Sequence, residues 1–269
     1  EKIATAHLTE ASLDFSVKSQ PAKWAEKLGA VLLPTGSLRR NSGGDISELP
    51  GFDDGEWWVQ DASARLPALL FGDVKGKTIL DSCAAPGGKT AQLANVGAHV
   101  IALDRSKARM KRLEENLTRL NLSANLQIGD AEEFETTESL DGILLDAPCS
   151  STGTLRRHPD VAYLKSQADV DKLTLLQARL LDAASKQLSA NGILVYSVCS
   201  LQPEEGEQQI AALLSRDQSL KRQPVLAGEI GGAQELINDA GDIRCLPFHM
   251  GGIDGFFAAR LVKISGGDA

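Results

Sequence analysis

The sequence has few aromatic residues, no long apolar run and no closely spaced pair of cysteines. Aromatic residues make up 4% of the 269 residues, and no apolar segment approaches the roughly 20 residues of a membrane-spanning helix. Because no charged and then apolar leader opens the chain, we expect a cytoplasmic protein rather than a membrane or secreted one. The cysteines form no C-x-x-C pair, which argues against a zinc site or a disulfide scaffold. We therefore expect free thiols and no metal.

Basic residues are also fewer than acidic ones. The chain has 28 Lys and Arg residues against 36 Asp and Glu residues, a formal net charge of -8. This balance argues against a protein that holds nucleic acid by bulk electrostatics, so any nucleic-acid site must be local. With 42% hydrophobic residues the chain can bury a sizeable core, which excludes disordered and fibrous classes.

From Thr78 onward, short apolar runs alternate with longer helical stretches. This pattern is typical of β-α units in a parallel sheet with helices on both faces. We expect strands at residues 78–81, 99–104, 125–128, 141–146, 192–198 and 256–262. We expect helices at residues 88–94, 106–120, 167–188 and 203–215. The third helix has apolar residues at every third or fourth position, as one buried face requires: Val170, Leu173, Leu176, Leu180 and Ala184.

The first part of the chain has a different pattern. Apolar and polar residues alternate over residues 13–17, a short helix is expected at 21–28, and an apolar run follows at 31–33. An amphipathic segment at residues 59–70 connects this part of the chain to the larger domain. We therefore divide the chain into residues 1–72, a small α+β unit with a connecting helix, and residues 73–269, an α/β domain.

The strongest local motif is Asp81-Ser-Cys-Ala-Ala-Pro-Gly-Gly-Lys-Thr90, which follows a strand and opens a helix. Adjacent glycines let a ligand approach the backbone, and the free amides at a helix start favour a charged or polar group. A phosphate-binding loop needs glycine five residues before Gly88, but Cys83 stands there, so a nucleotide hydrolase is not indicated.

A nucleoside cofactor predicts an acid about 20 residues further on, at the end of the next strand, to bind the ribose. Asp104 stands there, and Asp130 ends the following strand, where it can accept a hydrogen bond from an adenine amino group. Either acid alone can be a helix N-cap. Together they favour S-adenosylmethionine over a dinucleotide.

Two cysteines follow two other strands. Asp146 and Cys149 come just after one strand, and Cys199 follows another, at the edge where open α/β sheets bind ligands. A lone cysteine is more often a small buried hydrophobe, but two at strand ends indicate a reactive role. A thiolate is a potent nucleophile, and Asp146, if shielded from water, can stay protonated and donate to a ring nitrogen.

Three segments carry a family resemblance: D-S-C-A-A-P-G-G-K-T, L-D-A-P-C-S-S-T-G-T and Y-S-V-C-S-L-Q-P-E-E. In this order they resemble the S-adenosylmethionine-dependent RNA cytosine-C5 methyltransferases, above all the bacterial 16S ribosomal RNA methyltransferase B (Sun) group. The resemblance covers about residues 13–263. It implies an α/β fold: a Rossmann-like methyltransferase domain with a mostly parallel seven-stranded sheet, preceded by a small RNA-recognition-like α+β domain. A helical RNA-binding domain that precedes this unit in the family is not part of the sequence.

The resemblance also implies roles for individual residues. Asp104 would bind the ribose and Asp130 the adenine region, with Arg109 and Asp146 also at the cofactor. The methionine part of the cofactor would lie against the residues of the glycine-rich turn: Cys83, Ala84, Ala85, Pro86, Gly87, Gly88 and Lys89.

For the reaction, the resemblance implies that Cys199 adds to carbon 6 of the target cytosine. Asp146 would hydrogen-bond or protonate nitrogen 3, and Cys149 would assist loss of the carbon-5 proton and release of Cys199. In DNA cytosine methyltransferases the Pro-Cys thiol is the nucleophile, which would favour Cys149, but the RNA-type motif around Cys199 favours Cys199. The family usually has Thr before this cysteine, where this chain has Val198. Such chemistry requires the base out of its stack.

Local basic groups are candidates for RNA contact. Arg156, Arg157 and His158 follow the Cys149 motif, where they either contact phosphates or form a solvated loop. The basic residues at 105–112 are expected to form a solvated helix face. Trp57 and Trp58 could stack on bases, but a core contact at the domain junction is the expected role.

We expect a monomer that acts on RNA, namely 16S ribosomal RNA not yet assembled into the mature subunit. Three alternatives remain open. The first is a tRNA cytosine methyltransferase, which would share the same motifs. The second is an RNA-binding assembly factor without turnover, and the third is a small-molecule methyltransferase.

Overall fold

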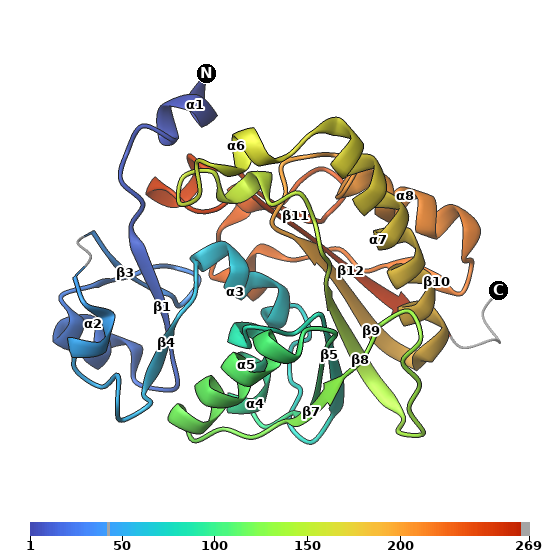
Figure 1. Cartoon of the computed structure of the whole chain (residues 1–269), viewed down its shortest axis with the longest axis horizontal. Coiled ribbons are helices and arrows are strands. Elements are labelled where there is room, and N and C mark those ends of the chain that lie inside the picture. Colours follow the sequence, from blue (N-terminus) through green and yellow to red (C-terminus); the bar gives the residue numbers. More distant parts are fainter. Residues whose placement is uncertain (42–43, 265–269) are drawn as a thin grey trace.

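A computed structural model describes residues 1–41 and 44–264 and contains two sheets (Figure 1). After the short helix α1 (Lys2–Ala6), the small antiparallel sheet has the strand order β2-β3-β1-β4. Its strands are β1 (Leu13–Val17), β2 (Val31–Leu32), β3 (Leu38–Arg40) and β4 (Trp57–Val59). Helix α2 (Pro21–Leu28) packs on this sheet, and its Trp24 joins Phe15 and Trp57 in a buried cluster. The sequence predicted α2 correctly but not β3 or β4.

The large sheet has the order β10-β12-β9-β8-β5-β6-β7, and β11 pairs with β12 outside this path. Neighbouring strands from β7 to β9 run parallel, while β12 runs antiparallel to β9. The seven strands of the path agree with the expected, mostly parallel sheet, and β11 is an eighth. The strands are β5 (Thr78–Ser82), β6 (His99–Asp104), β7 (Asn125–Ile128), β8 (Leu140–Asp146), β9 (Leu188–Val198), β10 (Leu220–Arg222), β11 (Ile243–Cys245) and β12 (Phe256–Lys263).

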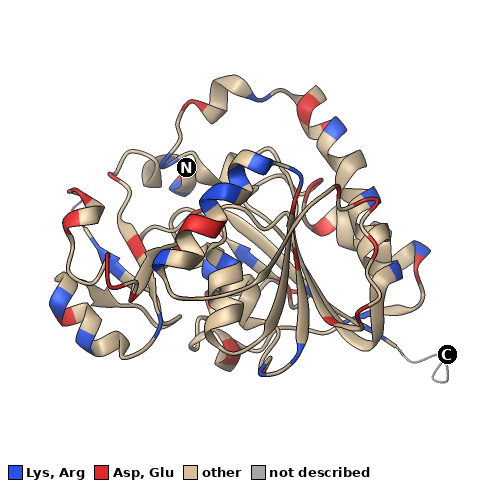
Figure 2. Cartoon of the chain, turned by 60° about the horizontal axis from the view of Figure 1, so that its bottom comes forward, with Lys and Arg blue, Asp and Glu red and all other residues tan. Residues whose placement is uncertain are grey.

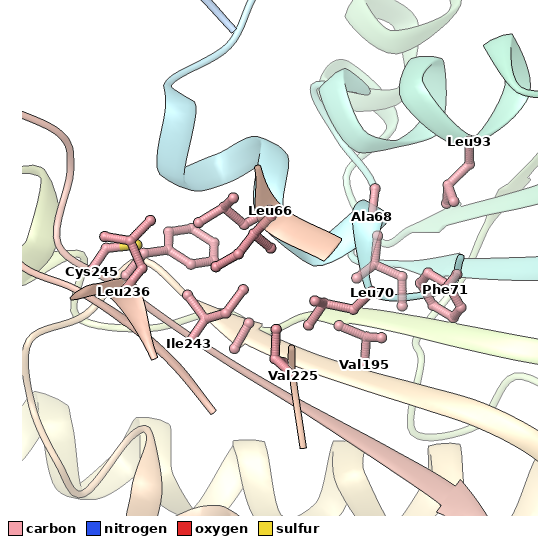
Figure 3. Close-up of a cluster of buried hydrophobic side chains, with 14 of the residues drawn as sticks. Leu66, Ala68, Leu70, Phe71, Leu93, Val195, Val225, Leu236, Ile243 and Cys245 are labelled. Carbon is pink, nitrogen blue, oxygen red and sulfur yellow. The ribbon is translucent and has the colours of Figure 1, made fainter. Parts of the chain in front are cut away.

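Helices cover both faces of the large sheet. Successive strand residues point to opposite sides, so a strand with a continuous apolar run presents apolar side chains to both faces. Leu144 of β8 faces a cluster with α3 (Ala62–Leu69) and α4 (Gly88–Asn95), and Figure 3 shows side chains of this cluster, including Cys245. Ile143 and Leu145 face the opposite cluster with α7 (Gln167–Gln187) and α8 (Glu207–Arg216). Helix α5 (Lys107–Arg119) packs on β6 through Met110, Leu113 and Leu117.

Two helices depart from the sequence-based expectation. Helix α8 begins at Glu207, four residues later than expected, because residues 203–206 form a turn that buries Glu205. In α7, Val170, Leu180 and Ala184 are buried as expected, whereas Leu173 and Leu176 are only partly covered. A further short helix, α6 (Val161–Leu164), lies before α7. No helix in the described part of the chain is long and apolar enough to cross a membrane.

A buried ion cluster joins the segment after the small sheet to the last strand of the large one. Arg156 pairs with Asp61, the N-cap of α3, and its Nε donates to Asp254 Oδ1 at 2.9 Å. Arg156 is 4% exposed, so it is not the phosphate contact that the sequence suggested. Arg157, which also pairs with Asp254, keeps 39% of its side chain exposed, and His158 is exposed.

The tryptophans divide between two cores. Trp58 packs with Ala84 and Ala85 under the glycine-rich turn, as expected of a junction residue. Trp57 instead lies in the core of the small sheet, with its ring centroid 4.9 Å from that of Phe15. Neither side chain offers a ring for a base to stack on, because both are buried.

Replacement of Arg156 by Ala should lower the free energy of unfolding by about 3–5 kcal/mol, because it leaves the buried Asp61 carboxylate without its cation. Burial by itself raises the pKa of Asp61, but Arg156 and the Ser63 hydroxyl and amide hold it below its ordinary value. Urea titration measures the loss. His158→Ala, an exposed change in the same loop, is the control, and equal stability of the two variants would contradict the role of the cluster.

Candidate active site

The predicted site residues come together at one edge of the large sheet. The carboxyl ends of β5, β6, β8 and β9 meet there, and β5 lies between β6 and β8, which follow it in sequence on opposite sides. In open α/β sheets a ligand crevice forms where the strand order reverses in this way. The same edge therefore receives the glycine-rich turn and both cysteine motifs.

The glycine-rich turn needs unusual backbone conformations. Cys83 has φ 64° and Gly87 has φ 100°, and α4 begins at Gly88. A Cβ at Gly87 would lie 2.7 Å from Leu113 Cγ, so glycine is required there for both conformation and space. Burial and the nearby Asp146 raise the pKa of Cys83 to about 12, so this thiol is not a nucleophile.

Asp104 anchors the turn from the next strand. It is 3% exposed, and its carboxylate accepts hydrogen bonds from the amides of Ala85 at 3.2 Å and Ser106 at 2.9 Å. Arg109 stands in the first turn of α5. Its Nη1 lies 3.4 Å from Asp104 Oδ2, and its Nη2 donates to the carbonyl of Ala85. Arg109 therefore has a definite place at the turn, although about half of its side chain is exposed.

A small cavity opens beside Asp104. Four predicted cofactor residues line it: Cys83, Asp104, Arg109 and Asp130. The remaining wall is mostly aliphatic and includes residues that the sequence gave no reason to select: Pro148, Leu176 and Leu180. The other residues of the turn, from Ala84 to Lys89, do not line this cavity.

The two cysteines of the strand ends form a close pair. Cys149 Sγ lies 3.5 Å from Cys199 Sγ, and Cys199 Sγ lies 3.6 Å from Ser151 Oγ. The hydrogen bond to Cys199, together with burial, raises the pKa of Cys149 well above its ordinary value. The same hydrogen bond lowers the pKa of Cys199, and Ser151 and Lys89 contribute in the same direction against burial. Cys199 is thus the more acidic thiol of the pair and the one that forms a thiolate first.

Asp146 lies in a polar group beside the cysteines. Its Oδ2 accepts from Lys89 Nζ at 2.7 Å, and its Oδ1 accepts from Ser197 Oγ at 2.8 Å. The side chain of Asp146 is not shielded from water, since 32% of it is exposed. Lys89, predicted to hold the cofactor, is buried and turned towards this carboxylate. No sequence signal showed this pairing, since the two residues lie 57 positions apart.

Three further observations concern the surroundings of the site and the question of a metal ion. Burial raises the pKa of Asp81, on β5, to about 7, and its Oδ2 accepts from Thr90 at 2.5 Å. Val198, which stands where the resembled family usually has Thr, packs in the apolar cluster with α7 and α8. Among the described residues no group of three or more His, Cys, Asp or Glu side chains could hold a metal ion.

Comparison with known proteins identifies the family. The model for 16S rRNA methyltransferase RsmB/F matches residues 68–262. The chain belongs to this family. A relative from Photorhabdus laumondii, named ribosomal RNA small subunit methyltransferase B, is 43% identical over 223 residues, which cover 81% of this chain and 49% of the relative. This member of the RsmB/F family thus spans about half the length of the curated relatives it matches.

Solved structures agree with the RsmB/F assignment. A methyltransferase homologue from Pyrococcus horikoshii has a TM-score of 0.81 at 27% identity and covers 98% of this chain and 90% of its own. NSun6 from the same organism, solved with SFG, has a TM-score of 0.69 at 30% identity and covers 83% of this chain and 57% of its own.

Iodoacetamide should alkylate Cys199 at least about tenfold faster than Cys149, because only the thiolate reacts and one unit of pKa is a tenfold change in its population. The rate at Cys199 should rise with pH and level off below the usual pKa of 9.0. Peptide mass spectrometry across a pH series gives both rates. In Cys149→Ala the plateau should move to higher pH, since the donor is gone, and an unmoved plateau would contradict the shared hydrogen bond.

Proposed function

We propose that this chain transfers a methyl group from S-adenosylmethionine to carbon 5 of a cytosine in ribosomal RNA, most directly 16S ribosomal RNA before its assembly into the subunit. The observation that carries the proposal is the cysteine pair with a 3.5 Å separation at the sheet edge, in a member of the RsmB/F family. The cytoplasm, where ribosomal RNA is found in bacteria, is the proposed location, and a monomer the proposed state.

The cavity beside Asp104 fits the cofactor in its chemistry. Asp104 and Asp130 offer carboxylates for ribose hydroxyls and an adenine amino group, and Leu176 and Leu180 offer an aliphatic wall for the adenine ring. Arg109 and Asp146 are also proposed to contact the cofactor. The other proposed cofactor residues form the glycine-rich turn: Cys83, Ala84, Ala85, Pro86, Gly87, Gly88 and Lys89. NSun6 from Pyrococcus horikoshii was solved with SFG, which supports a ligand-binding role for this domain. When bound, S-adenosylmethionine supplies an electrophilic methyl group.

The first proposed step belongs to Cys199. Its thiolate adds to carbon 6 of the cytosine, a carbon–sulfur bond forms, and the electron pair of the 5,6 double bond becomes available at carbon 5 for the methyl group. Asp146 orients the base by accepting a hydrogen bond from its 4-amino group, beside nitrogen 3. Nitrogen 3 of cytosine is itself an acceptor, and both oxygens of Asp146 already accept hydrogen bonds from Lys89 and Ser197, so this carboxylate pairs with the amino group.

The second proposed step belongs to Cys149. Once Cys199 is a neutral thioether, the adjacent negative charge that disfavours ionisation of Cys149 is gone. Cys149 then loses its thiol proton to solvent, and its thiolate accepts the carbon-5 proton. The electron pair of that C–H bond re-forms the 5,6 double bond, and the Cys199–carbon bond breaks to restore the Cys199 thiolate. Residues 1–72 are proposed to orient the RNA, and residues 73–269 to carry out the reaction.

Cys149→Ala should trap the covalent protein–RNA adduct, because addition proceeds but release does not. The variant is incubated with cellular RNA and S-adenosylmethionine and run on a denaturing gel beside wild type, Cys199→Ala and the control Cys245→Ala. Adduct should accumulate in Cys149→Ala alone, and Cys199→Ala should retain less than about a thousandth of wild-type transfer. Adduct in Cys199→Ala would exchange the two roles, and adduct in neither would contradict covalent capture by this chain.

Asp104→Ala should weaken S-adenosylmethionine binding by about tenfold or more, as expected when a charged hydrogen-bond acceptor is removed. Isothermal calorimetry measures the affinity. Asp104→Asn keeps the shape of the side chain and separates loss of charge from collapse of the turn, and Glu115→Ala, exposed on α5, is the control. Unchanged affinity in both Asp104 variants would remove this residue from the cofactor site.

A further inference from the structure

Glu205 is a buried carboxylate at the end of the Y-S-V-C-S-L-Q-P-E-E segment, and neither the sequence analysis nor the proposed mechanism gives it a role. It lies in the turn between β9 and α8 and is 0% exposed. In the described part of the chain it forms no ion pair with a Lys or Arg side chain. An unpaired buried charge is costly, so its retention requires compensation by hydrogen bonds.

Four hydrogen bonds supply this compensation. Glu205 Oε1 accepts from the Ser150 amide at 2.8 Å and from Gln177 Nε2 at 3.1 Å. Glu205 Oε2 accepts from Ser150 Oγ and from Ser200 Oγ, both at 2.5 Å. A carboxylate accepts about four hydrogen bonds, so its capacity is filled. Since each serine has one hydroxyl proton and directs it to Oε2, the site requires an acceptor and suits a carboxylate.

The two serines directly follow the two cysteines of the active site. Ser150 is next to Cys149, and Ser200 is next to Cys199, so one carboxylate binds the chain immediately after both thiols. Further bonds join the same loops: the Gly153 amide donates to the Cys199 carbonyl at 3.1 Å, and the Leu201 amide donates to Thr152 Oγ1 at 3.0 Å. The two serine hydroxyls also lie 3.2 Å apart, but with both protons directed to Oε2 they do not bond to one another, so Glu205 links them.

We propose that Glu205 is a positioning residue that holds the two cysteine-bearing loops together, so that the thiols keep their 3.5 Å separation. The inference rests on the proposed function for its consequence in catalysis, but the geometry of the thiols can be tested without RNA. The charge of Glu205 has a second effect, since it contributes, after the Cys199 hydrogen bond and burial, to the raised pKa of Cys149. Glu205 thus acts on both the distance between the thiols and their difference in ionisation.

The separation of the thiols is tested by oxidation with diamide, in which two thiols lose two protons and two electrons to the reagent and form one disulfide. Wild type should form the Cys149–Cys199 disulfide, read by peptide mass spectrometry. Glu205→Ala should form it at least about tenfold more slowly, because a misplacement of about 1 Å lowers the effective concentration of aligned groups strongly. Glu204→Ala, a neighbouring carboxylate outside the hydrogen-bonded group, should match wild type.

Glu205→Gln tests the charge with little change of shape, and it also serves if Glu205→Ala does not fold. Its amide oxygen can still accept from the Ser150 amide, and its NH2 group can donate to the Ser150 and Ser200 hydroxyl oxygens once these hydroxyls rotate. Both loops therefore stay linked, and disulfide formation should stay near the wild-type rate. Alkylation of Cys149 should shift to lower pH, because the neighbouring negative charge is gone. A purely structural role for Glu205 would leave this pH profile unmoved.

Methyl transfer separates this inference from the proposed function. In Glu205→Ala, kcat should fall by about 100-fold while S-adenosylmethionine affinity stays within about threefold of wild type. If no protein sample methylates RNA but disulfide formation still differs between the variants, the positioning role holds and the proposed function fails. If Glu205→Ala matches wild type in disulfide formation and in kcat, the positioning role is wrong.

Discussion

The parallel pairing of β8 with β9 is the contact on which the site depends. Its register sets Asp146 beside Ser197, so the chain leaves both strands at the same level and Cys149 and Cys199 follow within a few residues. A parallel pair needs a long crossover, and α7 supplies it while covering one face of the sheet. Because β5 pairs with the other side of β8, the glycine-rich turn and Lys89 arrive at the same edge.

Much of the large sheet could be predicted from the sequence, because its central strands are buried on both faces and read as continuous apolar runs. The starts of β5 to β7 agree with the structure. The short strands β3, β10 and β11 have three residues each and are defined by distant partners rather than by a local pattern. The late start of α8 has a similar origin, since a long-range contact buries Glu205 where local propensity favours helix.

The site shows the same division. The strand-end acids and cysteines could be selected because motif spacing places them at known points of a β-α unit, and four of the cofactor residues do line one cavity. The pairing partners of the charged side chains could not be predicted from the sequence. Lys89 pairs with Asp146 and Arg156 with Asp61 across 57 and 95 positions, and such pairings depend on the packed fold. Figure 2 shows Lys and Arg as well as Asp and Glu on several helices in one view of the chain.

The hydrogen bond between the two thiols has a consequence for how the roles of the cysteines are divided. The two groups are chemically identical, so their intrinsic chemistry gives neither one priority as the donor or the acceptor of this hydrogen bond. The bias comes from the surroundings: Lys89 and Ser151 favour the anion on Cys199, while the carboxylate of Glu205 disfavours it on Cys149. The difference in pKa between the two thiols is therefore set by the residues around them and not by the cysteines themselves. A pair of thiols with oppositely placed charges would have the opposite polarity on the same backbone.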